Sequence, residues 1–151
     1  MISNILYDFR LFISGDQESP VGFSIYPISD AVYNDGQTVN FNAVISNLGG
    51  HFNTKTSSFV CPFDGVYFFS LNYLSLFNEG QEDDSQLCIM QDTKIIACVR
   101  SSNNGINHAS GFVIVSCSLG ESIWVQSVGT SDIAGDENKD TIFSGYLLYR
   151  Y

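Results

Sequence analysis

Basic residues are scarce in this sequence, and their scarcity excludes whole classes of partner. Six lysines and arginines stand against sixteen aspartates and glutamates, so the formal net charge is −10 over 151 residues. A surface of that sign repels nucleic-acid phosphates and anionic bilayers, and we therefore expect no nucleic-acid partner. No apolar run approaches the roughly 20 residues of a membrane helix, so membrane insertion is not expected either.

Imidazole groups are almost as scarce, since His51 and His108 are the only histidines. Neither lies in a metal-ligand spacing, and the sequence has no nucleophile elbow, phosphate-binding loop or dinucleotide fingerprint. An enzyme needs a nucleophile, a base or a metal held in a defined constellation. We therefore expect no catalytic residues and no enzymatic activity.

Four cysteines are too few for a disulfide scaffold, and they lack the paired spacing of a zinc site. Cys88 and Cys98 flank a short turn, and a three-residue loop at 92–94 would place them opposite each other on a hairpin, within disulfide range. A bridge is one interpretation, and two buried free thiols are the other. Cys61 and Cys117 are expected to be reduced and buried.

Apolar and aromatic side chains are abundant by contrast. The composition is 44% hydrophobic and 14% aromatic, with 15% charged residues, which suits one folded, strand-rich domain. Short apolar runs alternate with glycine and asparagine turn signals, a pattern typical of a β-sandwich. Strands are predicted at residues 21–26, 38–46, 66–77, 86–91, 95–100, 111–118, 122–128 and 141–149.

Two of these predicted strands, 66–77 and 141–149, are apolar on both faces. In 66–77, one face carries Tyr67, Phe69, Leu71, Tyr73 and Phe77, and the other carries Val66, Phe68, Leu74 and Leu76. In 141–149, one face carries Phe143, Leu147 and Tyr149, and the other carries Tyr146 and Leu148. A two-layer domain covers only one face of each sheet. We expect the other face to meet another subunit, and the alternative is that loops of the same chain cover it.

Residues 1–20 fit a strand face and a helix stripe equally well. We interpret them as an N-terminal arm or extra strand whose apolar side docks on the domain, on a neighbouring subunit or on a stalk. Asp8 and Arg10 interrupt the opening apolar run, so it does not match a signal peptide, and export would require a leader that has been removed. The globular domain is assigned to residues 21–151.

The middle of the chain carries a more specific pattern. It consists of Phe41, Asn47, Phe52, Phe59 and the run Gly65-Val66-Tyr67-Phe68-Phe69, separated by five, four, six and five residues. This spacing resembles the signature of the C1q domain, the globular head of complement C1q. The last signature position, usually Phe or Tyr, is Leu71, an apolar exchange that should preserve packing.

Two later stretches, 118–125 and 143–148, resemble further segments of the same family in the same order, so the resemblance covers residues 21–151. It implies an all-β, ten-stranded jelly-roll sandwich of the tumour-necrosis-factor-like type, assembled as a homotrimer. It also implies a secreted, extracellular module of innate immunity that binds patterned ligands, such as a microbial surface or, like a lectin, a glycan. The alternative is a cytokine-like or synaptic-organiser-like ligand for a specific protein receptor.

Asp136, Asn138 and Asp140 are the candidate metal ligands. They are spaced like the start of a calcium loop, but Thr141 stands where such a loop has glycine and Leu147 where it has its closing glutamate. Family members that bind calcium near the trimer apex make calcium the possible cofactor. The alternative is an exposed acidic loop without an ion.

Overall fold

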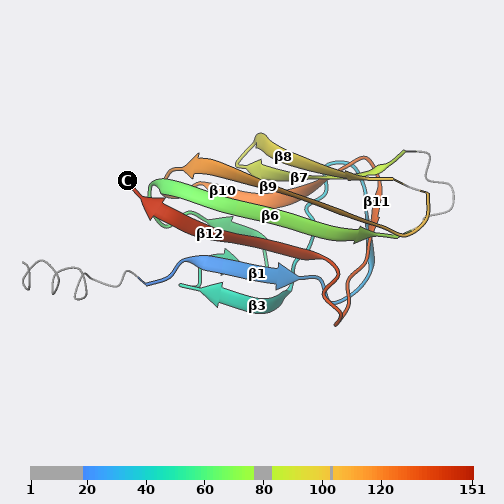
Figure 1. Ribbon diagram of the computed structural model, residues 1–151, viewed down its shortest axis with the longest axis horizontal. Helices are drawn as coiled ribbons and strands as arrows, with labels where there is room; N and C mark the ends of the chain where they lie inside the picture. The colour runs from blue at the N-terminus through green and yellow to red at the C-terminus, as the bar shows by residue number, and fades with distance from the viewer. Residues whose placement is uncertain (1–18, 77–82, 103) are drawn as a thin grey trace, which may run out of the picture.

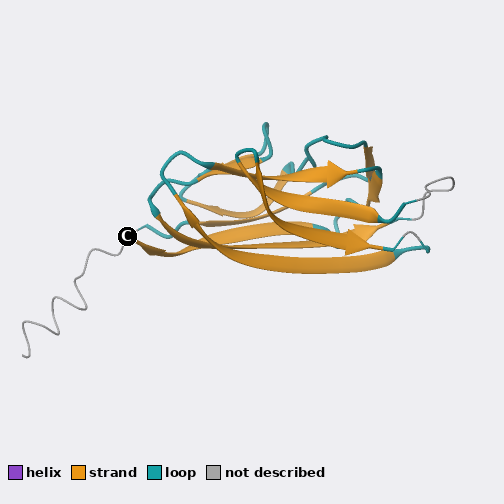
Figure 2. Ribbon diagram, turned by 90° about the horizontal axis from the view of Figure 1, so that it is seen from above, coloured by secondary structure: helices purple, strands orange, loops and turns teal. Residues whose placement is uncertain are grey.

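The computed structural model describes residues 19–76, 83–102 and 104–151, and the regular structure in these ranges is all β-strand (Figure 1, Figure 2). Most of the predicted N-terminal arm, residues 1–18, lies outside the described residues, as does Phe77. No helix in the described part of the chain is long and apolar enough to cross a bilayer.

Twelve strands follow one another within the described residues. They are β1 (Gly22–Tyr26), β2 (Ala31–Tyr33), β3 (Ala43–Leu48), β4 (Phe52–Asn53), β5 (Ser58–Val60), β6 (Gly65–Ser75), β7 (Ser85–Gln91), β8 (Lys94–Ser101), β9 (Asn107–Cys117), β10 (Ser122–Val128), β11 (Ser131–Ile133) and β12 (Ile142–Arg150). The long strands follow the predicted segments closely. The count exceeds the ten of the resemblance because several strands are only two or three residues long.

The strands form two antiparallel sheets that pack face to face (Figure 2). The first sheet has the order β2-β11-β6-β12-β1-β3, with β9 on the other edge of β6, and the second has the order β4-β5-β10-β7-β8. Neighbours such as β1 and β12 are far apart in sequence, so the sandwich closes through long-range pairing. The prediction of an all-β sandwich is confirmed.

The core between the sheets is built around the aromatic side chains of the signature. On β6, the inward side chains from Tyr67 to Tyr73 are fully buried. The Phe23 ring lies 4.9 Å from that of Phe52, 5.0 Å from that of Phe59 and 5.0 Å from that of Phe143. Four strands from both sheets thus meet in one aromatic cluster.

Asn47 of the signature has a hydrogen-bonding role. Its side-chain amide donates to the Phe52 carbonyl at 2.9 Å, and its side-chain oxygen accepts from the Phe52 amide at 3.1 Å. These two bonds close the turn at Gly49 and Gly50, which both have positive φ values, 83° and 73°. The turn joins an edge of the first sheet to an edge of the second.

The Cys88–Cys98 disulfide is present, which confirms the bridged interpretation, although the turn differs from the predicted three-residue loop. Gln91 pairs directly with Lys94, so the turn has two residues. A bulge between Ile89 and Met90 then shifts the register by one residue and brings the two cysteines opposite each other. Without it, a two-residue turn would have misaligned them.

Two further expectations need correction. Residues 38–42 of the predicted strand 38–46 form only an isolated bridge, Thr38 with Gln126. At the C-terminus, a register shift after Leu147 pairs Tyr149 with Val66. Tyr149 therefore shares the face of Val66 and is 58% exposed, instead of following Leu147 inward.

Candidate functional site

The outer face of the first sheet, the side turned away from the second sheet, carries large apolar side chains that are exposed to solvent. It is formed by alternate residues of β6, β9 and β12, which lie side by side through antiparallel pairing (Figure 1). Along this face the chemistry changes from apolar to polar. The apolar half lies toward the C-terminal end of β12, where Tyr146 pairs with Phe68, and the polar half lies toward the start of β9, where His108 pairs with Leu74.

The apolar half is aromatic and open to solvent. Phe112 of β9 is 69% exposed, Ile114 is 58% exposed and Tyr146 of β12 is 48% exposed. The Phe68 ring of β6 lies between two of them, with ring centroids 5.7 Å from Phe112 and 5.3 Å from Tyr146. An apolar cluster of this kind on a folded domain marks an interaction surface.

The polar half begins where two serines meet at the centre of the sheet. The hydroxyls of Ser24 and Ser144 are hydrogen-bonded at 2.7 Å. Beyond them, a shallow hollow of about 330 Å³ is lined by Asn72, Ala109, Ser110 and Ile142 of the sheet, together with His108, Lys139 and Asp140. At its edge, His108 Nε2 lies 4.0 Å from Asp140 Oδ1, a contact that is an ion pair only when the histidine is protonated.

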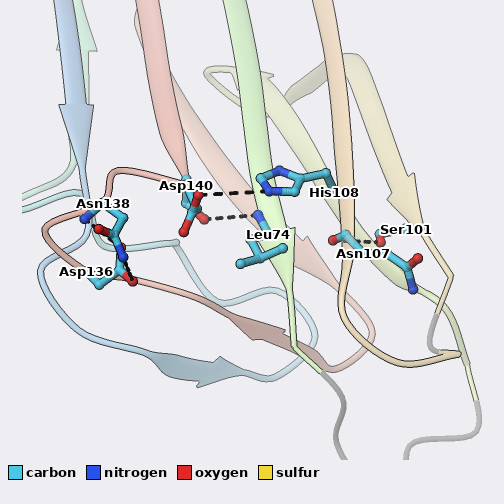
Figure 3. A network of polar contacts seen from close by, with 8 residues as sticks. Leu74, Ser101, Asn107, His108, Asp136, Asn138 and Asp140 are labelled. Carbon is cyan, nitrogen blue, oxygen red and sulfur yellow. Dashed lines mark hydrogen bonds and ion pairs between the residues drawn. The ribbon is translucent and has the colours of Figure 1, made fainter.

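The loop before β12 carries the three predicted calcium ligands, but it does not bring them into one cluster. Asn138 donates its backbone amide to one Asp136 carboxylate oxygen at 3.0 Å and its side-chain amide to the other at 3.2 Å. Asp140 instead faces His108 on the sheet, as Figure 3 shows. Among the described residues, no group of three or more His, Cys, Asp or Glu side chains is placed to hold a metal ion.

The acidic stretch 132–140 also contains a carboxyl group with a raised pKa. Burial raises the pKa of Asp132 on β11, and repulsion from the nearby Asp30 carboxylate raises it further. Asp30 itself accepts a hydrogen bond from the Gly135 amide at 2.9 Å. The acidic stretch 132–140 is therefore partly built into the fold rather than fully solvated.

The sequence pointed to the outer face through β6 and β12, but the exposed side chains of β9 were missed. The signal was present: Phe112 and Ile114 alternate with Val113 and Val115, so this strand is also apolar on both faces. From the sequence, His108 is only one of two histidines and receives no role. Its position opposite Leu74 on β6, and hence beside Asp140, depends on strand register that the sequence does not reveal.

The model of the C1q domain family matches residues 23–148. A polypeptide of the complement C1q subcomponent from Rattus norvegicus is 28% identical over 114 residues, which are 74% of this chain and 43% of that protein. Complement C1q and tumor necrosis factor-related protein 9 from Mus musculus is 27% identical over 114 residues, 74% of this chain and 33% of that protein. The chain thus spans less than half the length of these curated relatives.

Solved structures agree on the fold. The globular domain of zebrafish complement 1qA protein superimposes with a TM-score of 0.67 at 21% identity, covering 87% of this chain and 99% of that one. Eiger TNF from S. frugiperda gives 0.68 at 7% identity, covering 89% and 96%. The jelly-roll prediction is confirmed. Because the family model covers well over half of its residues, this chain belongs to the C1q domain family.

Proposed function

We propose that this chain is a secreted, extracellular binding module that assembles as a homotrimer and uses its polar end to bind patterned ligands. The observation that carries the proposal is the exposed aromatic cluster on the outer face of the first sheet, with Phe112 at 69% exposure. The complement relatives support an extracellular setting. Membership of the C1q domain family, with relatives named as a complement protein and a tumor necrosis factor-related protein, supports binding rather than catalysis.

The exposed apolar face supports assembly with other copies, and the number three comes from membership of the C1q domain family. In a closed ring of three copies, each copy would bury this face against a different patch of its neighbour. Burial of such side chains stabilises by about 25 cal/mol per Å² of apolar area. Light scattering of the protein at micromolar concentration should therefore give the mass of three chains.

One variant pair makes the assembly test specific to this face. Phe112→Asp places a charge inside the proposed interface, and the trimer should dissociate to folded monomers. Leu119→Asp is the matched control, because Leu119 is 68% exposed but lies on the turn between β9 and β10. It should leave the trimer intact. A monomeric wild type, or equal effects of the two variants, would refute the proposal.

Patterned ligands suit a trimer because three weak sites on one rigid body gain avidity, by about 10²- to 10⁴-fold where the geometry matches. Broad, weak binding to microbial envelopes or glycan arrays that strengthens on trimer formation would support recognition. The alternative function is a cytokine-like or synaptic-organiser-like ligand. One saturable receptor with nanomolar affinity and no glycan binding would favour that alternative.

We also propose calcium as an ion of the polar end. Within one chain, Asp136 and Asn138 are in contact, but Asp140 faces His108 instead. The described residues of a single copy therefore do not supply a complete set of oxygen ligands for calcium. Carboxylate and amide oxygens from neighbouring copies would complete it, since calcium takes six to eight oxygen ligands. Asp136, Asn138 and Asp140 are the residues that would hold the ion.

Titration calorimetry and thermal melting with and without calcium test this site. Calcium should raise the melting temperature of the wild type, and Asp136→Ala with Asp140→Ala should abolish that shift. Glu137→Ala removes one charge from the same loop without touching a proposed ligand, and it should retain the shift. An acidic loop without an ion would show no calcium-dependent change in any of these proteins.

A further inference from the structure

Cys61 and Cys117 are the two cysteines outside the disulfide, and the fold brings them together. Cys61 follows β5 and is fully buried, while Cys117 ends β9 and is 2% exposed. Both belong to the same core cluster. The pairing of β5 with β10 continues past Ser122, so that Cys61 lies opposite Glu121.

Backbone hydrogen bonds fix this approach. The Cys61 amide donates to the Glu121 carbonyl at 2.9 Å, and the Gly120 amide donates to the Cys61 carbonyl at 2.8 Å. A turn then reverses the chain, with the Glu121 amide donating to the Ser118 carbonyl at 3.1 Å, so the residue just before the turn, Cys117, returns to Cys61. The two thiols influence each other, and Cys117 is the largest cause of the raised pKa of the Cys61 thiol.

Polar side chains hold the second thiol from outside the core. The Gln91 side-chain amide lies 3.7 Å from Cys117 Sγ and donates to the Glu121 carboxylate at 2.6 Å. That carboxylate also accepts from the Ser118 amide at 2.8 Å. These contacts tie the turn to β7 and hold the Cys117 side chain in place.

We propose that Cys61 and Cys117 form a second, redox-dependent disulfide that locks the end of the sandwich nearest the chain terminus. Closure removes one proton and one electron from each thiol and forms one S–S bond. The oxidant is a low-molecular-weight disulfide, which accepts both electrons and both protons and leaves as two thiols. The bond would join the segment after β5 to the end of β9 and close a loop between residues 61 and 117.

The reduced pair is kinetically protected. The neighbouring Cys117 thiol and the burial of the site both raise the pKa of the Cys61 thiol, so the nucleophilic thiolate is scarce at neutral pH. Opening of the exposed turn at 118–120 is the route by which an oxidant reaches the sulfur atoms. Oxidation should therefore be slow in the native protein and much faster at alkaline pH with partial denaturant.

The experiment starts from protein with two free thiols per chain, counted in guanidinium hydrochloride without reductant. Incubation with excess glutathione disulfide at about pH 8.5 in subdenaturing guanidinium should reduce the count to zero. The melting temperature should then rise by several degrees, because a cross-link over a long loop restricts the unfolded chain. Cys117→Ser is the control, and it should gain no intramolecular bond and no such increase.

Peptide mapping without reduction identifies the bond. Cleavage after Lys94 and Arg100, with a further cleavage after Glu79, separates all four cysteines. The oxidised protein should yield a Cys61 peptide joined to a Cys117 peptide, with Cys88 still joined to Cys98. Two persistent thiols, glutathione adducts, bonds between chains, exchanged pairs or a lower melting temperature would each overturn the proposal.

Discussion

Gly145 of β12 offers the sharpest test of how the core is packed. It pairs with Phe23 of β1 on one side and with Phe69 of β6 on the other. A Cβ atom at this position would lie 2.4 Å from Phe69 Cδ1 and 2.8 Å from Phe23 Cε1. Carbon atoms pack at about 3.5–4.0 Å, so both rings would have to retreat by roughly 1 Å.

The rings have little room to retreat. Phe69 is fully buried and Phe23 is 3% exposed, and Phe23 packs against three other aromatic rings. Overpacking of this kind costs about 1–3 kcal/mol, and the lower backbone entropy of alanine in the unfolded chain recovers about 0.4–1 kcal/mol. Gly145→Ala should therefore lower the free energy of unfolding by about 1–2 kcal/mol, which lowers the melting temperature by roughly 2–8 °C in a domain of this size.

Circular dichroism melting at matched protein concentration measures the change, since oligomers melt in a concentration-dependent way. A double-mutant cycle with Phe69→Ala assigns it to the clash. Alanine removes Cδ1 and the rest of the ring, so the double variant should be more stable than the two single losses predict. An unchanged melting temperature for Gly145→Ala, or strict additivity in the cycle, would refute the packing argument.

Two further predictions concern polar groups. Asn47→Ala removes both hydrogen bonds to the Phe52 backbone and should lower the free energy of unfolding by about 1–3 kcal/mol, measured by denaturant titration. Asn53→Ala, at the exposed end of β4, is the milder control. The pKa of Asp132 is raised above its usual 3.8, so its charge destabilises the folded state increasingly as pH rises through the folded-state value. Asp132→Asn should therefore raise the melting temperature at pH 7, and this gain should disappear below about pH 3.8 because the carboxyl is then neutral in both states. A gain that persists in acid would show that charge is not its cause.

The long strands could be predicted because their alternation is local, whereas the short strands could not. β2 and β11 have three residues each, and they are strands only because partners distant in the sequence supply their hydrogen bonds. Residues 38–42 show the reverse. Val39 and Phe41 are buried at alternate positions, but the Phe41 amide donates to the Ser57 hydroxyl at 2.9 Å instead of to a neighbouring strand. The alternation of apolar residues therefore predicts which side chains of this segment are buried, although the segment forms no continuous β-ladder with a neighbouring strand.

The candidate site was harder to predict because, like the short strands, it depends on contacts between segments that are far apart in the sequence. The spacing of Asp136, Asn138 and Asp140 places them in one loop, but the direction of each side chain depends on what the fold brings opposite. Asp140 turns to His108 because β9 runs beside β6 in a register set by eleven paired positions. The register between β9 and β6 therefore cannot be predicted from any pattern of neighbouring residues.

The change from apolar to polar side chains along the outer face determines where the copies of a trimer would pack tightly and where their contacts would remain solvated. Phe112 and Tyr146 would form a dry contact near the chain terminus, whereas His108 and Asp140 lie at the polar end, where contacts remain solvated. Each copy carries a net charge of −10, so repulsion between copies is least compensated where apolar burial is absent. Salt or a divalent cation should therefore act on the polar end first, while the aromatic end keeps the copies together.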